Sequence, residues 1–272
     1  MDSPQLKINQ NKGNKNKQFK LKYIVESNLE IRIFGTKFVN NNKDKCHLII
    51  NNNDCELKEK YNFKEKGEQT ITLVIDEEII NFDGMFCLPK GFFPLVDASS
   101  LEDLDTSEAI NLSSMFCGCN RIADFSFVQN WDVSKCANFE YIFKNCSFTN
   151  VNFLSNWNTM KAISLRGVFD GCCRLNDIKG IKNWNVTNSK YFSYMFYCCE
   201  NLIDVNAIQY WNMTNAIAID HMFCYCKKLN NMDSLYKWKL NSKVDKTMVV
   251  SYCSNLKNIP SNLKVDEECN II

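Results

Sequence analysis

Apolar and aromatic side chains recur along residues 104–253 at a nearly constant interval of 26 or 27 positions. A first anchor is followed twelve positions later by a second anchor, and three positions after that by a cysteine. The first anchors are Leu104, Trp131, Trp157, Trp184, Trp211 and Trp238, the second are Phe116, Phe143, Phe169, Phe196, Phe223 and Val250, and the cysteines are Cys119, Cys146, Cys172, Cys199, Cys226 and Cys253. A fixed interval of this length predicts a chain that winds into stacked coils, each of which needs its neighbours to bury its core.

Within a unit, the apolar positions are about three residues apart. In the half before the tryptophan they are, for example, Leu175, Ile178, Ile181 and Trp184, a spacing that suggests a short strand with inward-facing side chains. In the half after the tryptophan they are, for example, Val133, Cys136, Phe139, Ile142 and Phe143, which we interpret as one face of a short helix or 3₁₀ turn. We therefore expect an α/β solenoid of about six coils, each with a short strand and a short helix.

Residues before the recurring units show a different pattern. Leu48 and Ile50, and then Ile71, Leu73 and Ile75, alternate with less apolar neighbours, which is typical of half-buried strands. We predict a disordered basic tail at 1–18, a β-rich capping domain with an antiparallel sheet at 19–80, the solenoid at 81–265 and a C-terminal tail at 266–272. The capping domain would cover the open edge of the first coil.

Composition and charge narrow the possible partners. The chain has 272 residues, of which 45% are hydrophobic, so it can bury a substantial core. Lys plus Arg total 32 and Asp plus Glu total 31, so no global field selects an anionic partner and nucleic acid is not expected. The six lysines among residues 1–22 indicate a solvated arm, with contact to nucleic acid or an anionic membrane as the alternative.

The sequence also indicates where the protein resides. It shows no apolar stretch of the kind found in secretory signals and no uncharged apolar run long enough to cross a bilayer. We therefore expect no transmembrane segment and a cytoplasmic location, with the cell surface, reached by unconventional export, as the alternative. In a reducing cytosol the 15 cysteines would mostly be small buried hydrophobes. A disulfide zipper between cysteines of adjacent coils is a second hypothesis that would need an oxidising compartment.

Candidate chemistry is sparse. His221, Cys224 and Cys226 have a spacing that could ligate zinc, but the recurring unit already accounts for both cysteines. No phosphate-binding glycine loop, serine-hydrolase elbow or zinc-protease motif occurs. We expect no cofactor, no metal and no enzymatic activity. An enzyme that uses the thiol-rich region is a weaker hypothesis, which predicts one thiol far more reactive than its neighbours.

One unit, CENLIDVNAIQYWNMTNAIAIDHMFCYC, carries a family resemblance. Its leucine-bearing strand, W-N-x-T turn and terminal M-F-x-x-C resemble the leucine-rich-repeat variant of BspA-like surface proteins and of mycoplasmal lipoproteins of unassigned function. The resemblance covers roughly residues 81–265 and implies a right-handed leucine-rich-repeat-like solenoid that serves binding or adhesion. The segment IRIFGTKFVNNNKDKCHLII is similar to the β-rich leader of such repeats in protist proteins.

These patterns favour a non-catalytic scaffold that binds proteins of unknown identity. Polar residues between the inward-facing apolar positions differ from unit to unit and form a candidate protein-binding face, which we call the polar face: Asn176, Asp177, Asp204, Asn206, Asn230 and Asp233. A solvated surface without a ligand is an equally simple interpretation of this face. The alternative function is a cell-surface adhesin or host-matrix-binding protein of the BspA-like type. The sequence does not predict the oligomeric state.

Overall fold

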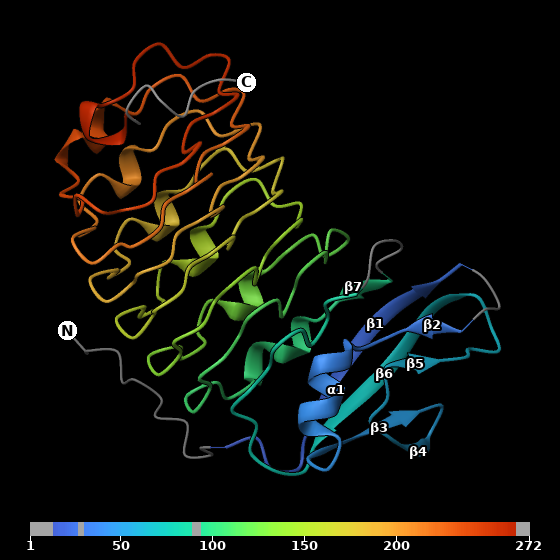
Figure 1. The fold of residues 1–272 in the computed structure, drawn as a ribbon. Coiled ribbons are helices and arrows are strands. Elements are labelled where there is room, and N and C mark those ends of the chain that lie inside the picture. The colour runs from blue at the N-terminus through green and yellow to red at the C-terminus, as the bar shows by residue number, and fades with distance from the viewer. Residues whose placement is uncertain (1–12, 27–29, 89–93, 265–272) are drawn as a thin grey trace, which may run out of the picture.

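A computed structural model describes residues 13–26, 30–88 and 94–264. The chain forms two parts that lie end to end (Figure 1). The first part, residues 13–97, contains the strands and, at residues 81–87, an irregular first turn of the stack, and is called the sheet region. The second, residues 98–264, winds in stacked coils and is called the coiled region (Figure 1).

The sheet region contains a five-stranded antiparallel sheet in the order β4-β3-β6-β1-β7. Its strands are β1 (Lys17–Val25), β3 (Cys46–Ile50), β4 (Asn53–Glu56), β6 (Gly67–Ile75) and β7 (Leu95–Asp97). A second, two-stranded sheet pairs β2 (Ile31–Arg32) with β5 (Lys60–Tyr61). The predicted alternations are confirmed in β3 and β6, where Leu48, Ile71 and Leu73 are fully buried. Asn51 and Asn52, both with positive φ, turn the chain from β3 into β4, as the asparagine run suggests.

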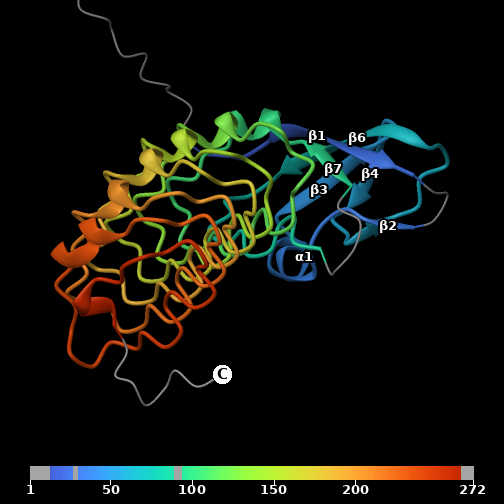
Figure 2. The same ribbon diagram turned by 90° about the horizontal axis from the view of Figure 1, so that it is seen from above.

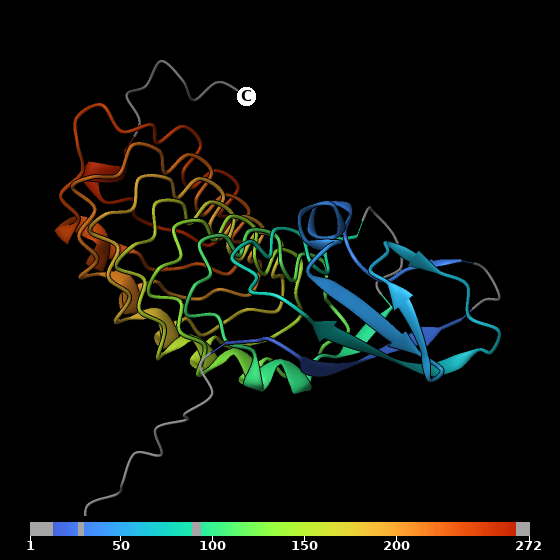
Figure 3. The same cartoon turned by 90° about the horizontal axis from the view of Figure 1, so that it is seen from below.

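The helix α1 (Thr36–Asn42) joins the sheet region to the first turns of the coils. Phe34, just before α1, and Phe38, within it, stack on phenylalanines of the first turn. The ring centres of Phe34 and Phe86 lie 5.7 Å apart, and those of Phe38 and Phe82 lie 6.4 Å apart. Gly35 permits this approach, because a Cβ atom there would lie 2.0 Å from the carbonyl oxygen of Gly84. Figure 3 shows the sheet region at the end of the stack, next to the first coils.

Short 3₁₀ helices and isolated bridges shape the coiled region. Parallel bridges join one coil to the next, for example Asn111 to Asn138 and Asn138 to Ser164. Figure 2 shows the 3₁₀ helices in a row along one edge of the stack. They are η1 (Ser99–Asp103), η2 (Ser126–Val128), η3 (Asn152–Leu154), η4 (Lys179–Ile181), η5 (Asn206–Ile208), η6 (Asp233–Lys237) and η7 (Ser261–Leu263).

The predicted α/β, leucine-rich-repeat-like solenoid of strand-plus-helix coils is wrong. Within the described residues α1 is the one α-helix, and all the named strands precede residue 98. The supposed helical face is instead a series of tight turns, in which the amide of Cys136 donates to the carbonyl of Val133 and that of Ile142 to Phe139. A spacing of three fits such turns, whereas an α-helix repeats every 3.6 residues.

The tryptophans and the cysteines of the recurring unit hold the coils together, as expected for structural residues. We call these cysteines the ladder cysteines: Cys119, Cys146, Cys172, Cys199, Cys226 and Cys253. Each of the five tryptophan side chains is buried, and its Nε1 donates to a carbonyl oxygen of the preceding coil, as Trp184 does to Leu154 at 3.2 Å. The Cys172 thiol likewise donates to the Phe143 carbonyl at 3.1 Å. Phenylalanine rings stack in a column beside them, with Phe196 and Phe223 5.6 Å apart.

Most residues of the two predicted tails lie outside the described part of the chain. Of the predicted basic tail, residues 1–12 lie outside the described residues, while Gly13 and Asn14 hydrogen-bond Asp105. The predicted C-terminal tail, 266–272, also lies outside them. No helix in the described part of the chain has both the length and the apolar character that a membrane crossing requires.

Candidate functional site

The structure places the six residues of the polar face in equivalent turns of successive coils. The side chain of Asp177 accepts a bond from the Lys179 amide at 2.8 Å, and that of Asp204 accepts one from the Asn206 amide at 3.0 Å. The amides of Asn176 and Asn230 donate to carbonyls of the preceding coil. The polar face therefore exists as a surface, but Asp177 and Asp204 already close the turns in which they lie, and the Asp233 amide donates to Asn231.

A second surface was not singled out by the sequence. Half-buried and exposed aromatic side chains, joined by an arginine, follow one another across successive coils. We call this surface the aromatic row: Tyr141, Arg166, Tyr194, Tyr197, His221, Tyr225 and Tyr252. The tyrosines at 197, 225 and 252 keep nearly the interval of the recurring unit, which is the signal that could have revealed them.

Direct contacts connect the aromatic row from end to end. Arg166 Nε donates to the Tyr141 hydroxyl at 2.8 Å, and its guanidinium lies 5.1 Å from the centre of the Tyr194 ring. Tyr194 stacks on His221 at 4.6 Å and meets Tyr197 edge-on. The contacts continue from Tyr197 through Tyr225 to Tyr252, the last two rings being stacked 4.4 Å apart.

Several members of the aromatic row have an unusual backbone. Tyr141, Tyr194 and His221 have φ between 56° and 61°, and Tyr225 and Tyr252 have φ of 63° and 60°. The left-handed region costs non-glycine residues roughly 1–2 kcal/mol each. Equivalent positions in other coils carry glycine, such as Gly167 at φ 58°. The positive φ belongs to the recurring turn, since Ser114, Cys198 and Met248 share it at equivalent places, and the aromatic row occupies several of these positions.

The aromatic row carries one permanent positive charge. Hydrogen bonding to Tyr141 raises the pKa of Arg166. Burial raises the pKa of Tyr197 to about 12 and, together with the nearby Asp220, raises that of Tyr194. The Asp220 carboxylate accepts a bond from Ser193 and lies 3.3 Å from His221 Nδ1. Near neutral pH these two tyrosines are therefore uncharged and can both donate and accept hydrogen bonds.

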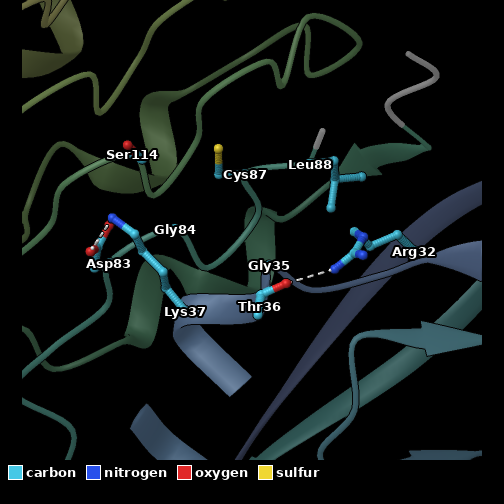
Figure 4. Close-up of a pocket in the computed structure, with 9 residues that line it drawn as sticks. All are labelled: Arg32, Gly35, Thr36, Lys37, Asp83, Gly84, Cys87, Leu88 and Ser114. Atoms are coloured by element: carbon cyan, nitrogen blue, oxygen red, sulfur yellow. Dashed lines mark hydrogen bonds and ion pairs between the residues drawn. The ribbon is translucent and has the colours of Figure 1, made fainter. Parts of the chain in front are cut away.

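A cavity of about 260 Å³ lies where α1 meets the first coil (Figure 4). Lys37 and Asp83 face each other across part of it at 3.0 Å, and Arg32 donates to Thr36 at 2.9 Å. Cys87 also lines the cavity. The Asp83 Oδ1 atom is buried without a hydrogen-bond partner. Charged side chains and a thiol thus occur together in this cavity.

The thiols fall into two groups. Burial raises the pKa of the ladder cysteines, as in Cys172 and Cys199, and their thiols donate to backbone carbonyls. Cys87 differs, because a hydrogen bond from the Cys117 thiol lowers its pKa to about 7. Burial and the Asp83 carboxylate oppose that shift, and Lys37 and Lys144 assist it.

The possible zinc cluster is not assembled as a set of ligands. The Cys226 thiol donates to the Phe196 carbonyl at 3.1 Å, and His221 stacks on Tyr194. In the described residues no three His, Cys, Asp or Glu side chains are placed to hold a metal ion together. The disulfide zipper is not formed either, since the 14 cysteines of the described part are free thiols.

Comparison with known proteins identifies the family. Residues 55–155 and residues 147–263 each match the family described as "Mycoplasma protein of unknown function, DUF285". The two matches together span more than half of the 272 residues. The chain belongs to this family. The predicted likeness to mycoplasmal proteins of unassigned function is confirmed by this match, whereas the match does not include the BspA-like or leucine-rich-repeat part of that prediction.

The DUF285 assignment leaves the function open, because the family is described as one of unknown function. Searches among curated proteins and among solved structures found no match to the chain. The two matched segments overlap at residues 147–155, within the coiled region, so the family's sequence pattern recurs along the stack. The function must therefore be argued from the surfaces described above.

Proposed function

We propose that this protein is a non-catalytic scaffold that binds another protein through the aromatic row. The observation that carries the proposal is the continuous contact of tyrosine, arginine and histidine side chains across successive coils. Tyrosine and arginine are the side chains most enriched at the centres of protein interfaces, since they combine apolar area with hydrogen-bonding groups.

The mutual packing of the aromatic row favours this use. The rings are already stacked, so binding would freeze few rotamers and would lose little conformational entropy. The coils hold the backbone beneath them through turns and bridges. The polar face, in contrast, offers short side chains whose oxygens at Asp177 and Asp204 already accept backbone bonds. The proposal therefore places the partner on the aromatic row and treats the polar face as the competing site.

The test compares the two faces in the full chain. An aromatic-row variant carries Tyr194→Ala and Tyr225→Ala, and a polar-face variant carries Asn206→Lys and Asn230→Lys. Tagged proteins are cross-linked in their own cells, and the attached proteins are quantified by mass spectrometry. We expect the aromatic-row variant to capture less than about one-tenth of the partner that the wild type captures, since two interface hot spots contribute about 2 kcal/mol or more each to binding.

The polar-face variant should retain that partner. A partner lost from the polar-face variant and kept by the aromatic-row variant would assign binding to the polar face instead. An identical cross-linking pattern for all three proteins would reject the scaffold proposal. Because the alanine changes could disturb the stack, the urea midpoint of each variant is measured beside the binding result.

A second candidate function is a cell-surface adhesin of the BspA-like type. It is supported by the W-N-x-T turn and terminal M-F-x-x-C motif, which occur here as Trp211–Thr214 and Met222–Cys226. We place the scaffold first because direct contacts join the surface proposed for it, the aromatic row, across successive coils. Labelling intact cells with a membrane-impermeant amine reagent separates the two, since only a surface adhesin would be modified before lysis.

A further inference from the structure

Cys87 and Cys117 occupy equivalent places in adjacent turns of the stack. The amides of Gly84 and Phe86 donate to the carbonyls of Ser113 and Met115, each at 2.8 Å. These bonds fix the register of the two segments, and the rings of Phe86 and Phe116 stack 5.7 Å apart. The residues that follow the two phenylalanines, Cys87 and Cys117, therefore lie side by side.

The same column shows how closely such neighbours approach. Lys144 and Asp170 occupy the equivalent places in the next two coils, and their side chains form an ion pair at 2.5 Å. Adjacent segments in a sheet-like arrangement lie about 4.8 Å apart. That separation falls inside the range of roughly 4.4–6.8 Å between the Cα atoms of disulfide-bonded cysteines.

Access to this pair comes from the cavity beside α1 (Figure 4). Cys87 lines the cavity and is half-buried, as is Cys117. Lys37 and Arg32 line the same cavity, where Lys37 is paired with Asp83 and Arg32 with Glu59. The ladder cysteines differ, since most of them are buried and donate to carbonyls.

We propose that Cys87 and Cys117 form a reversible dithiol site that reacts with low-molecular-weight disulfides, of which oxidised glutathione is the probe. This inference does not depend on the aromatic row or on the scaffold function. It concerns redox modification of the protein at the junction of its two regions.

The reaction proceeds by two exchanges. The Cys87 thiolate attacks one sulfur of the glutathione disulfide, forms a mixed disulfide and releases one glutathione thiolate. Cys117 then gives up its proton to solvent and attacks the Cys87 sulfur, which closes the Cys87–Cys117 disulfide and releases the second glutathione. Two protein thiols lose two electrons, and the glutathione disulfide gains them to become two thiols.

The first experiment treats the reduced full chain with oxidised glutathione at neutral pH and maps the products by mass spectrometry. In the wild type we expect a cross-linked pair of peptides that carry Cys87 and Cys117, with two free thiols lost. Cys117→Ala removes the resolving thiol, so glutathione should remain attached at Cys87. Cys198→Ser is the matched control, since Cys198 is also half-buried but lies outside this pair, and it should behave like the wild type.

A second measurement follows the rate at which iodoacetamide alkylates each cysteine at pH 7. With a pKa of about 7, roughly half of Cys87 is thiolate at this pH, against about 3% for an ordinary thiol. A thiolate of lower pKa is less nucleophilic, so we expect Cys87 to be alkylated only about threefold faster than an ordinary thiol. In Cys117→Ala the loss of the hydrogen bond should remove that advantage. Exposed Cys173 serves as the internal reference.

Two results would overturn the proposal. One is a wild-type map in which Cys87 and Cys117 remain reduced while Cys173 or Cys55 carries glutathione. The other is an alkylation rate at Cys87 that does not exceed that of Cys173. Circular dichroism shows whether Cys117→Ala is folded, and if it is not, the wild-type map and rates decide the question alone.

Discussion

In the sheet region, nine residues of β1 pair in unbroken register with β6. In the described coiled region, by contrast, no long strands pair, and neighbouring coils meet through isolated bridges and single backbone bonds, such as those from the amides of Ser114 and Phe116 to the carbonyls of Glu140 and Ile142. Tryptophan Nε1 atoms and cysteine thiols add side-chain bonds between the same coils. Backbone bonds thus hold both regions, and the coiled region adds a set of side-chain bonds to carbonyls of the neighbouring coil.

This difference explains why recurring residues of reactive type need not be functional sites. Cysteine, tryptophan and aspartate recur in the coils because each offers a donor or acceptor at the point where a neighbouring backbone group lacks one. Residues that recur without such a bond, such as Tyr225 and Tyr252, are the better candidates for function. The predictions below test how strongly each region depends on its side chains.

The largest difference should come from alkaline pH. Burial raises the pKa of the ladder thiols, so the folded chain keeps their protons while the unfolded chain loses them above an ordinary thiol pKa of about 8.5. Their stabilisation is therefore fully present below that pH and is lost as pH rises toward the folded pKa. At pH 9.5 each buried thiol should cost about 1.4 kcal/mol, and several together should lower the free energy of unfolding by several kcal/mol.

Tryptophan fluorescence measures this effect in the coiled region alone, because all five tryptophans lie there. Urea unfolding is followed at pH 7.5 and at pH 9.5. Cys199→Ala should show a smaller pH dependence than the wild type, by about one thiol's contribution. A midpoint that is the same at both pH values would contradict the dependence of the coils on their thiols.

The next effect is the loss of one side-chain donor. Trp184→Phe leaves the carbonyl of Leu154 without its bond and weakens the stacking on Trp157 and Trp211, at 6.3 and 6.4 Å. We expect a loss of about 2–4 kcal/mol in the free energy of unfolding. Tyr23→Phe is the matched change in the sheet region, since the Tyr23 hydroxyl donates to the Ile33 carbonyl at 3.0 Å. It should cost about 1–2 kcal/mol. If Tyr23→Phe proves the costlier change, the contrast between the regions is wrong.

The smallest effect concerns the left-handed turns. Gly171 has φ 72°, and a Cβ atom there would lie 2.0 Å from Asn145 Oδ1, so the Asn145 side chain would have to move. Gly171→Ala should cost about 2 kcal/mol in denaturant unfolding. The reverse change, Cys198→Gly at the equivalent place and φ 56°, should gain at most about 0.5 kcal/mol, because relief of strain is offset by the greater freedom of unfolded glycine. Equal effects of opposite sign would show that strain alone governs these turns.

Patterns of period two were interpreted correctly from the sequence and patterns of period three were not. Alternation at Ile71, Leu73 and Ile75 predicts β6 because strand side chains point to opposite faces. A spacing of three, as from Val133 to Cys136 and Phe139, is close to the 3.6 of an α-helix, and the choice depends on hydrogen bonds that a sequence does not contain. The structural use of the tryptophans could be inferred because five equivalent residues cannot all be a single site.

The aromatic row and the Cys87–Cys117 pair could be found only once it was known which residues of adjacent coils lie side by side. Cys87 lies in an irregular first turn, so its pairing with Cys117 cannot be obtained from the interval of the later units. Tyr194 and His221 stack because they occupy equivalent places in adjacent coils, 27 positions apart, but their residue types do not mark them as equivalent. The polar face was found from variability alone, which does not reveal that Asp177 and Asp204 close turns.

The tryptophan and cysteine bonds all point the same way along the chain. Each donor reaches a carbonyl of the coil made before it, and at the far end Asn262 fills this place by donating to the carbonyls of Leu235 and Trp238. A coil that has just left the ribosome therefore finds every acceptor for its own tryptophan and cysteine already present. Synthesis from the N-terminus can thus anchor the tryptophan and cysteine of each new coil on the coil before it, while amides such as those of Ser114 and Phe116 find their acceptors only in the coil that follows.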